Sequence, residues 1–79
     1  MAQKGNDSAA VQNFYQALRL DPNYAEAHNN LGVVLIRNGK IDEAASHFLR
    51  AVQLKSSYVT ARENLQKALK DMRNEEILR

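Results

Sequence analysis

Residues 21–54 read DPNYAEAHNNLGVVLIRNGKIDEAASHFLRAVQL, and two amphipathic patterns follow one another in this stretch. In the first, small and apolar residues recur every three or four positions and predict a helix over 24–37: Ala27, Leu31, Val34 and Leu35. The same spacing predicts a second helix over 41–54, on Ile41, Ala44, Ala45, Phe48, Ala51 and Val52. Asn38 and Gly39 separate the two, because glycine tolerates the left-handed conformation that ends a helix. So short a connection predicts an antiparallel helix hairpin.

The residues before the first helix carry signals for its start. Asn23 is followed three positions later by Glu26, which matches a capping pair, and Pro22 fixes the entry of the chain. Ser57 stands 34 positions after Asn23 and is expected to cap another helix.

The chain repeats itself with a period of 34 residues. Ten pairs of identical residues stand 34 positions apart, among them Phe14/Phe48 and Asn30/Asn64. The flanks therefore predict a copy of the second helix over 7–20 and a copy of the first over 58–73. The predicted fold class is all-α, with four helices in antiparallel pairs at about 7–20, 24–37, 41–54 and 58–73.

This pattern resembles the tetratricopeptide repeat, a helix–turn–helix of 34 residues that stacks into an α-solenoid. The resemblance rests on Pro22, Leu31, Gly32, Ala44, Phe48 and Ala51. It implies that Gly32 and Ala44 let paired helices approach closely, and that Phe48 fills the space between one hairpin and the next helix. The chain departs from the family at His28, where Trp is most common, and at Ser56, where a second turn proline would stand.

The resemblance also implies a division of the chain. Residues 1–23 correspond to the second helix of a truncated repeat, 24–57 to one complete repeat, and 58–79 to a capping helix with a tail. Gln66 stands 34 positions after Gly32, and its long side chain would keep a further helix away. The chain is thus expected to be the C-terminal part of a longer array, with Ala2–Gly5 aligned to the last turn of a missing helix.

Without that neighbour, the helix over 7–20 is expected to leave an apolar stripe in water. Burial of one Phe or Leu is worth about 1.5–3 kcal/mol, so an exposed stripe favours association between copies. The sequence therefore predicts a homo-oligomer, with self-association through Ala10, Val11, Phe14 and Leu18.

The resemblance implies a concave face, formed by the first helix of each pair, that binds a peptide or a partner helix. The residues expected on it are Glu26, Asn29, Asn30, Val33, Arg37, Thr60, Glu63, Asn64, Lys67 and Asp71. Asn30 and Asn64 stand in register, similar to the Asn-bearing repeats of O-linked N-acetylglucosamine transferases. An amide both donates and accepts, so it suits a peptide backbone. These asparagines could equally cap, bond a neighbouring helix or face water.

Other functions find less support in the sequence. Glu26 and Glu63 would repel the carboxylate that some repeats of this kind bind, and the period of 34 with scattered Lys and Arg argues against an RNA-binding repeat. Eleven Lys and Arg against nine Asp and Glu give a net charge of only +2, so no nucleic acid is expected. Glu43 and His47 could form a weak metal pair, but a packed or exposed histidine is the preferred interpretation.

Neither catalysis nor a cofactor is expected, because the chain has no cysteine, no Gly-rich phosphate loop and no catalytic triad spacing. Its longest apolar run, Val33–Ile36, is too short to cross a membrane. A soluble protein, cytoplasmic rather than secreted, is expected.

Overall fold

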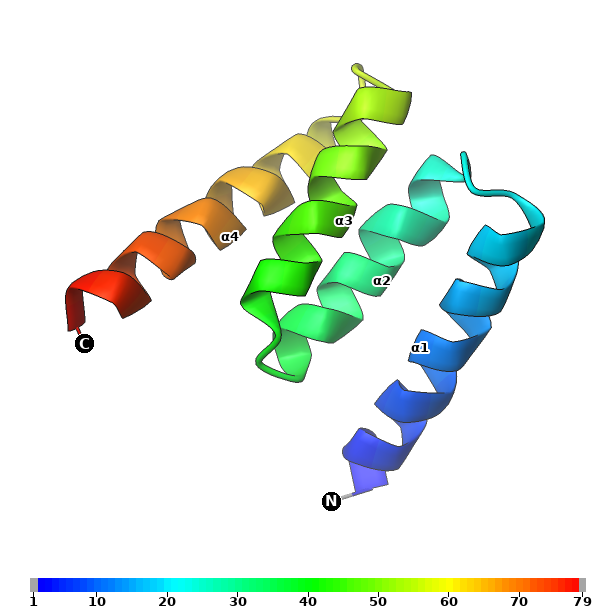
Figure 1. Cartoon of the computed structure of the whole chain (residues 1–79), viewed down its shortest axis with the longest axis horizontal. Coiled ribbons are helices and arrows are strands. Elements are labelled where there is room, and N and C mark those ends of the chain that lie inside the picture. Colours follow the sequence, from blue (N-terminus) through cyan, green and yellow to red (C-terminus); the bar gives the residue numbers. More distant parts are fainter. Residues whose placement is uncertain (1, 79) are drawn as a thin grey trace.

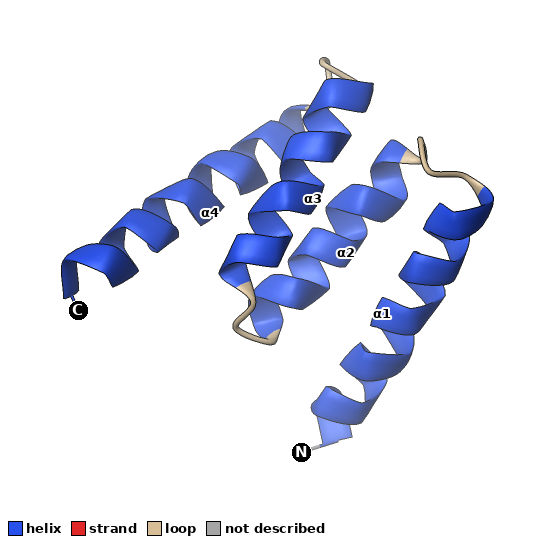
Figure 2. Cartoon of the chain, in the orientation of Figure 1, coloured by secondary structure: helices blue, strands red, loops and turns tan. Residues whose placement is uncertain are grey.

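The computed structural model describes the backbone of residues 2–78 and the side chains of residues 8–74. The described residues form four helices and no strand: α1 (Ala2–Leu20), α2 (Ala25–Arg37), α3 (Ile41–Leu54) and α4 (Val59–Leu78). Figure 1 shows them side by side in chain order, each running opposite to the one before. Each helix contacts the next, and α2 also contacts α4. The protein is therefore an all-α solenoid of antiparallel helix pairs, joined by short turns (Figure 2).

Both outer helices extend beyond the ranges of about 7–20 and 58–73. α1 begins at Ala2, so Ala2–Gly5 continue this helix and do not form the last turn of a separate one. A single interior glycine costs a helix only about 1 kcal/mol relative to alanine, so Gly5 does not break α1. α4 runs on to Leu78, so residues 74–78 extend the last helix, a point that the sequence left open. The chain has no glycine or proline after Gly39 that would stop it.

The turn before α2 differs from the predicted cap. Tyr24 occupies the cap position, and no side chain bonds the free N–H groups there. Asn23 does not cap α2, because it lies one residue before the cap position and its Oδ1 accepts from Arg50 Nη2 at 3.4 Å. Its backbone N–H donates to Asp21 Oδ1 at 3.2 Å. α4 likewise begins one residue after Tyr58, whose carbonyl accepts from the Arg62 N–H at 3.1 Å.

The end of α2 confirms the prediction from Gly39. Gly39 has a φ of 77°, in the left-handed region, and no other described residue has a positive φ. Its N–H donates to the Ile36 carbonyl at 3.0 Å, and the Lys40 N–H donates to the Leu35 carbonyl at 2.9 Å. This pair of bonds is the Schellman motif, which satisfies the last carbonyls of a helix.

The core lies between α2, α3 and α4. Its buried residues are Leu31, Leu35, Ala44, Ala45, Phe48 and Ala68. Alanine dominates this list because the helices cross closely and leave room for little more than a methyl group. Of the family positions quoted above, Leu31, Gly32, Ala44, Phe48 and Ala51 are buried and Pro22 is exposed in its turn.

The stripe on α1 is not left in water, contrary to the prediction. Val11, Phe14 and Leu18 are half-buried and pack against the core, and Ala10 is half-buried as well. They are covered because α1 lies along α2 and reaches the core cluster at Leu35 and its neighbours. Among the side chains of α1 that the structure describes, the large apolar ones that face water are Tyr15 and Leu20, which is 84% exposed. Over the described residues, no helix has the length and apolar character to cross a membrane.

Candidate binding groove

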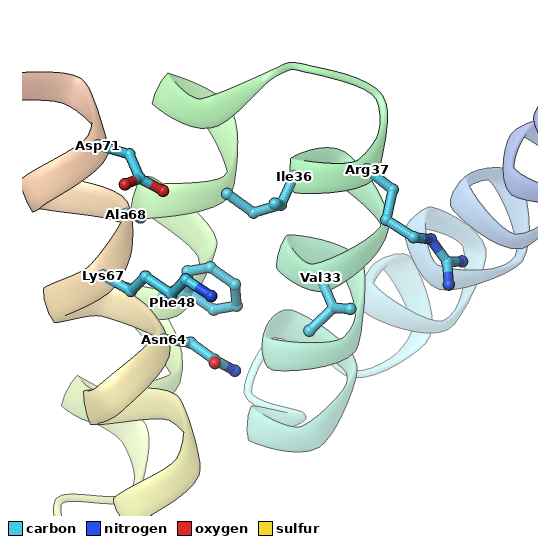
Figure 3. A pocket seen from close by; sticks show the side chains of 8 residues that line it. All are labelled: Val33, Ile36, Arg37, Phe48, Asn64, Lys67, Ala68 and Asp71. Atoms are coloured by element: carbon cyan, nitrogen blue, oxygen red, sulfur yellow. The ribbon is translucent and has the colours of Figure 1, made fainter. Parts of the chain in front are cut away.

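A groove runs between α2 and α4, with α3 beneath it. It encloses about 210 Å³. Eight residues line it: Val33, Ile36, Arg37, Phe48, Asn64, Lys67, Ala68 and Asp71 (Figure 3). We call this site the α2–α4 groove.

Helical spacing explains which residues reach the groove. On α2 the lining residues Val33, Ile36 and Arg37 fall at i, i+3 and i+4, so Ile36 and Arg37 both neighbour Val33 on one face of the helix. On α4 the lining residues Asn64, Lys67, Ala68 and Asp71 fall at i, i+3, i+4 and i+7. Phe48 comes from α3 and closes the floor between the two helices.

The floor and one wall of the groove are apolar. Phe48 and Ala68 are buried, 2% and 1% exposed, so they offer a fixed surface at the bottom. Val33 is 38% exposed and Ile36 is half-buried on the α2 wall. An apolar side chain placed here would gain about 25 cal/mol for each Å² removed from water.

An amide pair connects the two walls. Asn64 Nδ2 donates to Asn29 Oδ1 at 3.0 Å. Asn29 is buried, at 4% exposed, whereas Asn64 is half-buried and faces the groove. Because an amide has two donor hydrogens and an acceptor oxygen, Asn64 keeps bonding capacity for a ligand.

The charged residues of the groove come mainly from α4. Figure 3 shows the Lys67 side chain crossing in front of the Phe48 ring, with Asp71 one turn further along the same helix. The Arg37 guanidinium points away from α4, over the far side of α2. The groove therefore presents one cation and one anion beside its apolar floor.

Of the ten residues predicted for the concave face, the structure brings five into the groove: Val33, Arg37, Asn64, Lys67 and Asp71. Asn29 lies behind it as the partner of Asn64. Four others are exposed and do not line it: Glu26, Asn30, Thr60 and Glu63. The Glu26 carboxylate instead lies 3.5 Å from Lys55 Nζ.

The prediction of the concave face omitted three lining residues, namely Ile36, Phe48 and Ala68. Ile36 and Ala68 carry a signal in the sequence, because they follow Val33 and Asn64 by three and four positions. For Phe48 the sequence predicted only a packing role. Spacing relates residues within one helix, so it cannot show that a residue of α3 lies at the bottom of a groove between α2 and α4.

The two histidines lie apart from the groove and face each other between α2 and α3, with their Nδ1 atoms 3.0 Å apart. Glu43 stands one turn before His47 on α3. Among side chains 8–74, no three of the types His, Asp and Glu gather as ligands for a metal ion.

Comparison with known proteins agrees with this architecture. Residues 2–39 match the family described as TPR repeat, and residues 25–58 match the one described as Tetratricopeptide repeat. The human protein O-mannosyl-transferase TMTC2 is 40% identical over 68 residues, which is 85% of this chain and 8% of that protein. The peroxisomal targeting signal receptor of Saccharomyces cerevisiae is 39% identical over 62 residues, 78% of this chain and 10% of the receptor.

The peroxisomal targeting signal receptor of Candida glabrata is 42% identical over 52 residues, 66% of this chain and 9% of that receptor. The chain thus spans about a tenth or less of each of these relatives. The two matches together span residues 2–58, which include the hairpin of α2 and α3. The chain belongs to the tetratricopeptide-repeat family.

Proposed function

We propose that this chain is a protein-interaction module that binds an extended peptide of a partner protein in the α2–α4 groove. The observation that carries the proposal is the groove itself, an apolar floor of Phe48 and Ala68 between walls that bear an amide and two charges. Tetratricopeptide repeats in general mediate contacts between proteins.

The chemistry of the groove suits a peptide. An apolar side chain of the ligand would rest on Phe48 between Val33 and Ala68, where its burial supplies the affinity. The remaining N–H and the oxygen of Asn64 would bond the peptide backbone, which gives orientation without selecting a side chain. Lys67 and Asp71 would select for charges next to that apolar residue.

The relatives support a binding role. Two of them are receptors for a targeting signal, and we infer that the shared repeats serve recognition here as well. A third is a transferase, of which the matching segment makes up 8%. We assign recognition rather than catalysis to this segment, because its described side chains form an open groove and a packed core.

Affinity selection from random peptides displayed on phage tests the proposal. Enriched peptides are expected to share an apolar residue, and Val33→Asp is expected to weaken their binding at least tenfold. Val59→Asp is the matched control, because Val59 is 56% exposed on α4 and does not line the groove. Equal affinity of the two variants for the enriched peptides would contradict the proposal.

A second candidate function is self-association through α1. Tyr15 and Leu20 are exposed on this helix, and Phe14 and Leu18 are only half-buried. Sedimentation velocity over a range of concentrations would show a dimer that Leu20→Glu dissociates, while Gln16→Glu, also on an exposed part of α1, leaves it intact. A monomer at every concentration would eliminate this role.

A further inference from the structure

The two histidines form a chain of hydrogen bonds that spans three elements. His28 on α2 and His47 on α3 approach with their Nδ1 atoms 3.0 Å apart. The other ring nitrogen of His28, Nε2, lies 2.9 Å from the Pro22 carbonyl oxygen in the turn between α1 and α2. His28 is buried, at 9% exposed, and His47 is half-buried. These hydrogen bonds therefore connect the α1–α2 turn to α2 and α3.

The two rings meet nitrogen to nitrogen. Their centres are 5.3 Å apart and their planes are inclined by 27°. For two five-membered rings whose nitrogens are 3.0 Å apart, this is close to the greatest possible separation of the centres. The two Nδ1 atoms thus point directly at each other, and one proton between them makes a hydrogen bond.

The Pro22 carbonyl determines where the protons are. A carbonyl oxygen can only accept, so His28 Nε2 must carry a proton. In neutral His28 the Nδ1 is then a bare acceptor, and His47 Nδ1–H is the donor. The arrangement accommodates a single proton between the rings, because a second would set two N–H groups against each other.

The surroundings of the pair disfavour further protonation. Burial lowers the pKa of His47, and the charge that His28 would carry lowers it further, while Glu43 on α3 acts in the opposite direction. From α1 the Tyr15 ring meets the His47 ring at an angle of 69°, with the two ring centres 6.0 Å apart. Glu43 is therefore the acid that opposes the effect of burial.

We propose that His28 and His47 form a pH-sensitive latch that holds the α1–α2 turn, α2 and α3 together near neutral pH and opens when both rings are protonated. The latch depends on no ligand and is independent of the groove function. It needs histidine at both positions.

The direction of the pH dependence follows from the lowered pKa of His47. The unfolded chain, with a histidine pKa of about 6.5, binds more protons than the folded one at mildly acid pH. The stabilising effect is therefore complete above about pH 6.5 and is lost as the pH falls through the pKa of His47 in the folded protein.

Urea unfolding of the chain at pH 8.0, 7.0, 6.0 and 5.5 tests the latch, followed by circular dichroism. His47→Gln is the central variant, because its amide can still donate to His28 Nδ1 but does not titrate. The wild-type midpoint is expected to fall more steeply between pH 7.0 and 5.5 than that of His47→Gln. Equal slopes would overturn the proposal.

Two further measurements hold even where His47→Gln folds poorly. Nitrogen-15 NMR of the wild-type imidazoles is expected to show His28 protonated on Nε2 and His47 on Nδ1 at pH 8.0, with His47 titrating below the value of an unfolded peptide. Glu43→Gln is expected to move that titration to still lower pH, since it removes the one opposing charge. A His47 that titrates at or above the value of an unfolded peptide would overturn the proposal.

Discussion

The Phe48 ring fills the space that a β-carbon on Gly32 would occupy. A β-carbon built there would lie 2.5 Å from Phe48 Cε1, well inside contact distance. Gly32 is in the middle of α2 and Phe48 is in α3, both buried, so this contact sets how closely the two helices of the hairpin approach. Phe48 also floors the α2–α4 groove, so the same contact fixes the depth of the binding site.

Gly32→Ala is expected to destabilise the fold by up to about 2 kcal/mol. Alanine gains about 1 kcal/mol of helix propensity over glycine. A methyl group forced into a packed core costs about 1–3 kcal/mol, and the buried Phe48 ring has little freedom to move aside. The midpoint of urea unfolding measures the difference.

A double-mutant cycle with Phe48→Leu identifies the clash as the cause. Leucine lacks the ring atoms that crowd Gly32, so Gly32→Ala should cost less in the Phe48→Leu background than in the wild type. An equal cost in both backgrounds would assign the loss to another contact of Gly32.

Gly39→Ala is expected to lose about 1 kcal/mol for a different reason. No atom lies within 4 Å of a β-carbon built there, so the cost comes from the φ of 77° and not from crowding. Gly39→Asn is the informative comparison, because asparagine visits this conformation more readily than alanine. A loss from asparagine as large as that from alanine would contradict the backbone explanation.

The bounds of the inner helices could be predicted from the sequence, whereas those of the outer helices could not. Small and apolar residues at steps of three and four located α2 and α3, and Gly39 located the end of α2 correctly. The start of α1 was predicted wrongly, because a repeat alignment cannot tell a continued helix from a missing one. The sequence left the end of α4 open, since nothing in 74–78 breaks a helix. The cap predicted at Asn23 is wrong because α2 begins at Ala25, which puts Tyr24 at the cap position.

The groove was predictable only in part. Spacing on a single helix places Val33 beside Ile36 on α2, and likewise Lys67 beside Asn64 on α4. How α4 is rotated against α2 depends instead on the packing between the two helices. That rotation brings Asn64 to Asn29, not to Asn30, although Asn30 is the residue in register with Asn64. The hydrogen bond between His28 and His47 depends in the same way on how α2 and α3 cross.

The amide pair leads to a prediction about stability. Asn64→Ala is expected to cost about 1–3 kcal/mol, because it leaves Oδ1 of the buried Asn29 without its partner. Asn30→Ala is the control, since Asn30 is exposed and its replacement should change stability by less than about 0.5 kcal/mol. Thermal unfolding of both variants decides, and similar midpoints would mean that water replaces the lost amide.

The charge of Lys67 is expected to decide which peptides bind. Lys67→Glu would place two carboxylates, its own and that of Asp71, along the same wall of the groove. Peptides with an acidic residue next to the apolar one should then lose affinity by roughly fivefold, in line with about 1 kcal/mol for a partly exposed charge pair. Fluorescence polarisation at low and at high salt measures this loss, which salt should reduce because it screens exposed charges.

Lys70→Glu is the control, because it makes the same change in net charge on α4 but lies outside the groove. It therefore separates a direct contact with Lys67 from attraction by the overall charge of the helix. If Lys70→Glu weakens binding as much as Lys67→Glu does, the peptide is attracted by the overall charge of α4 and does not contact Lys67.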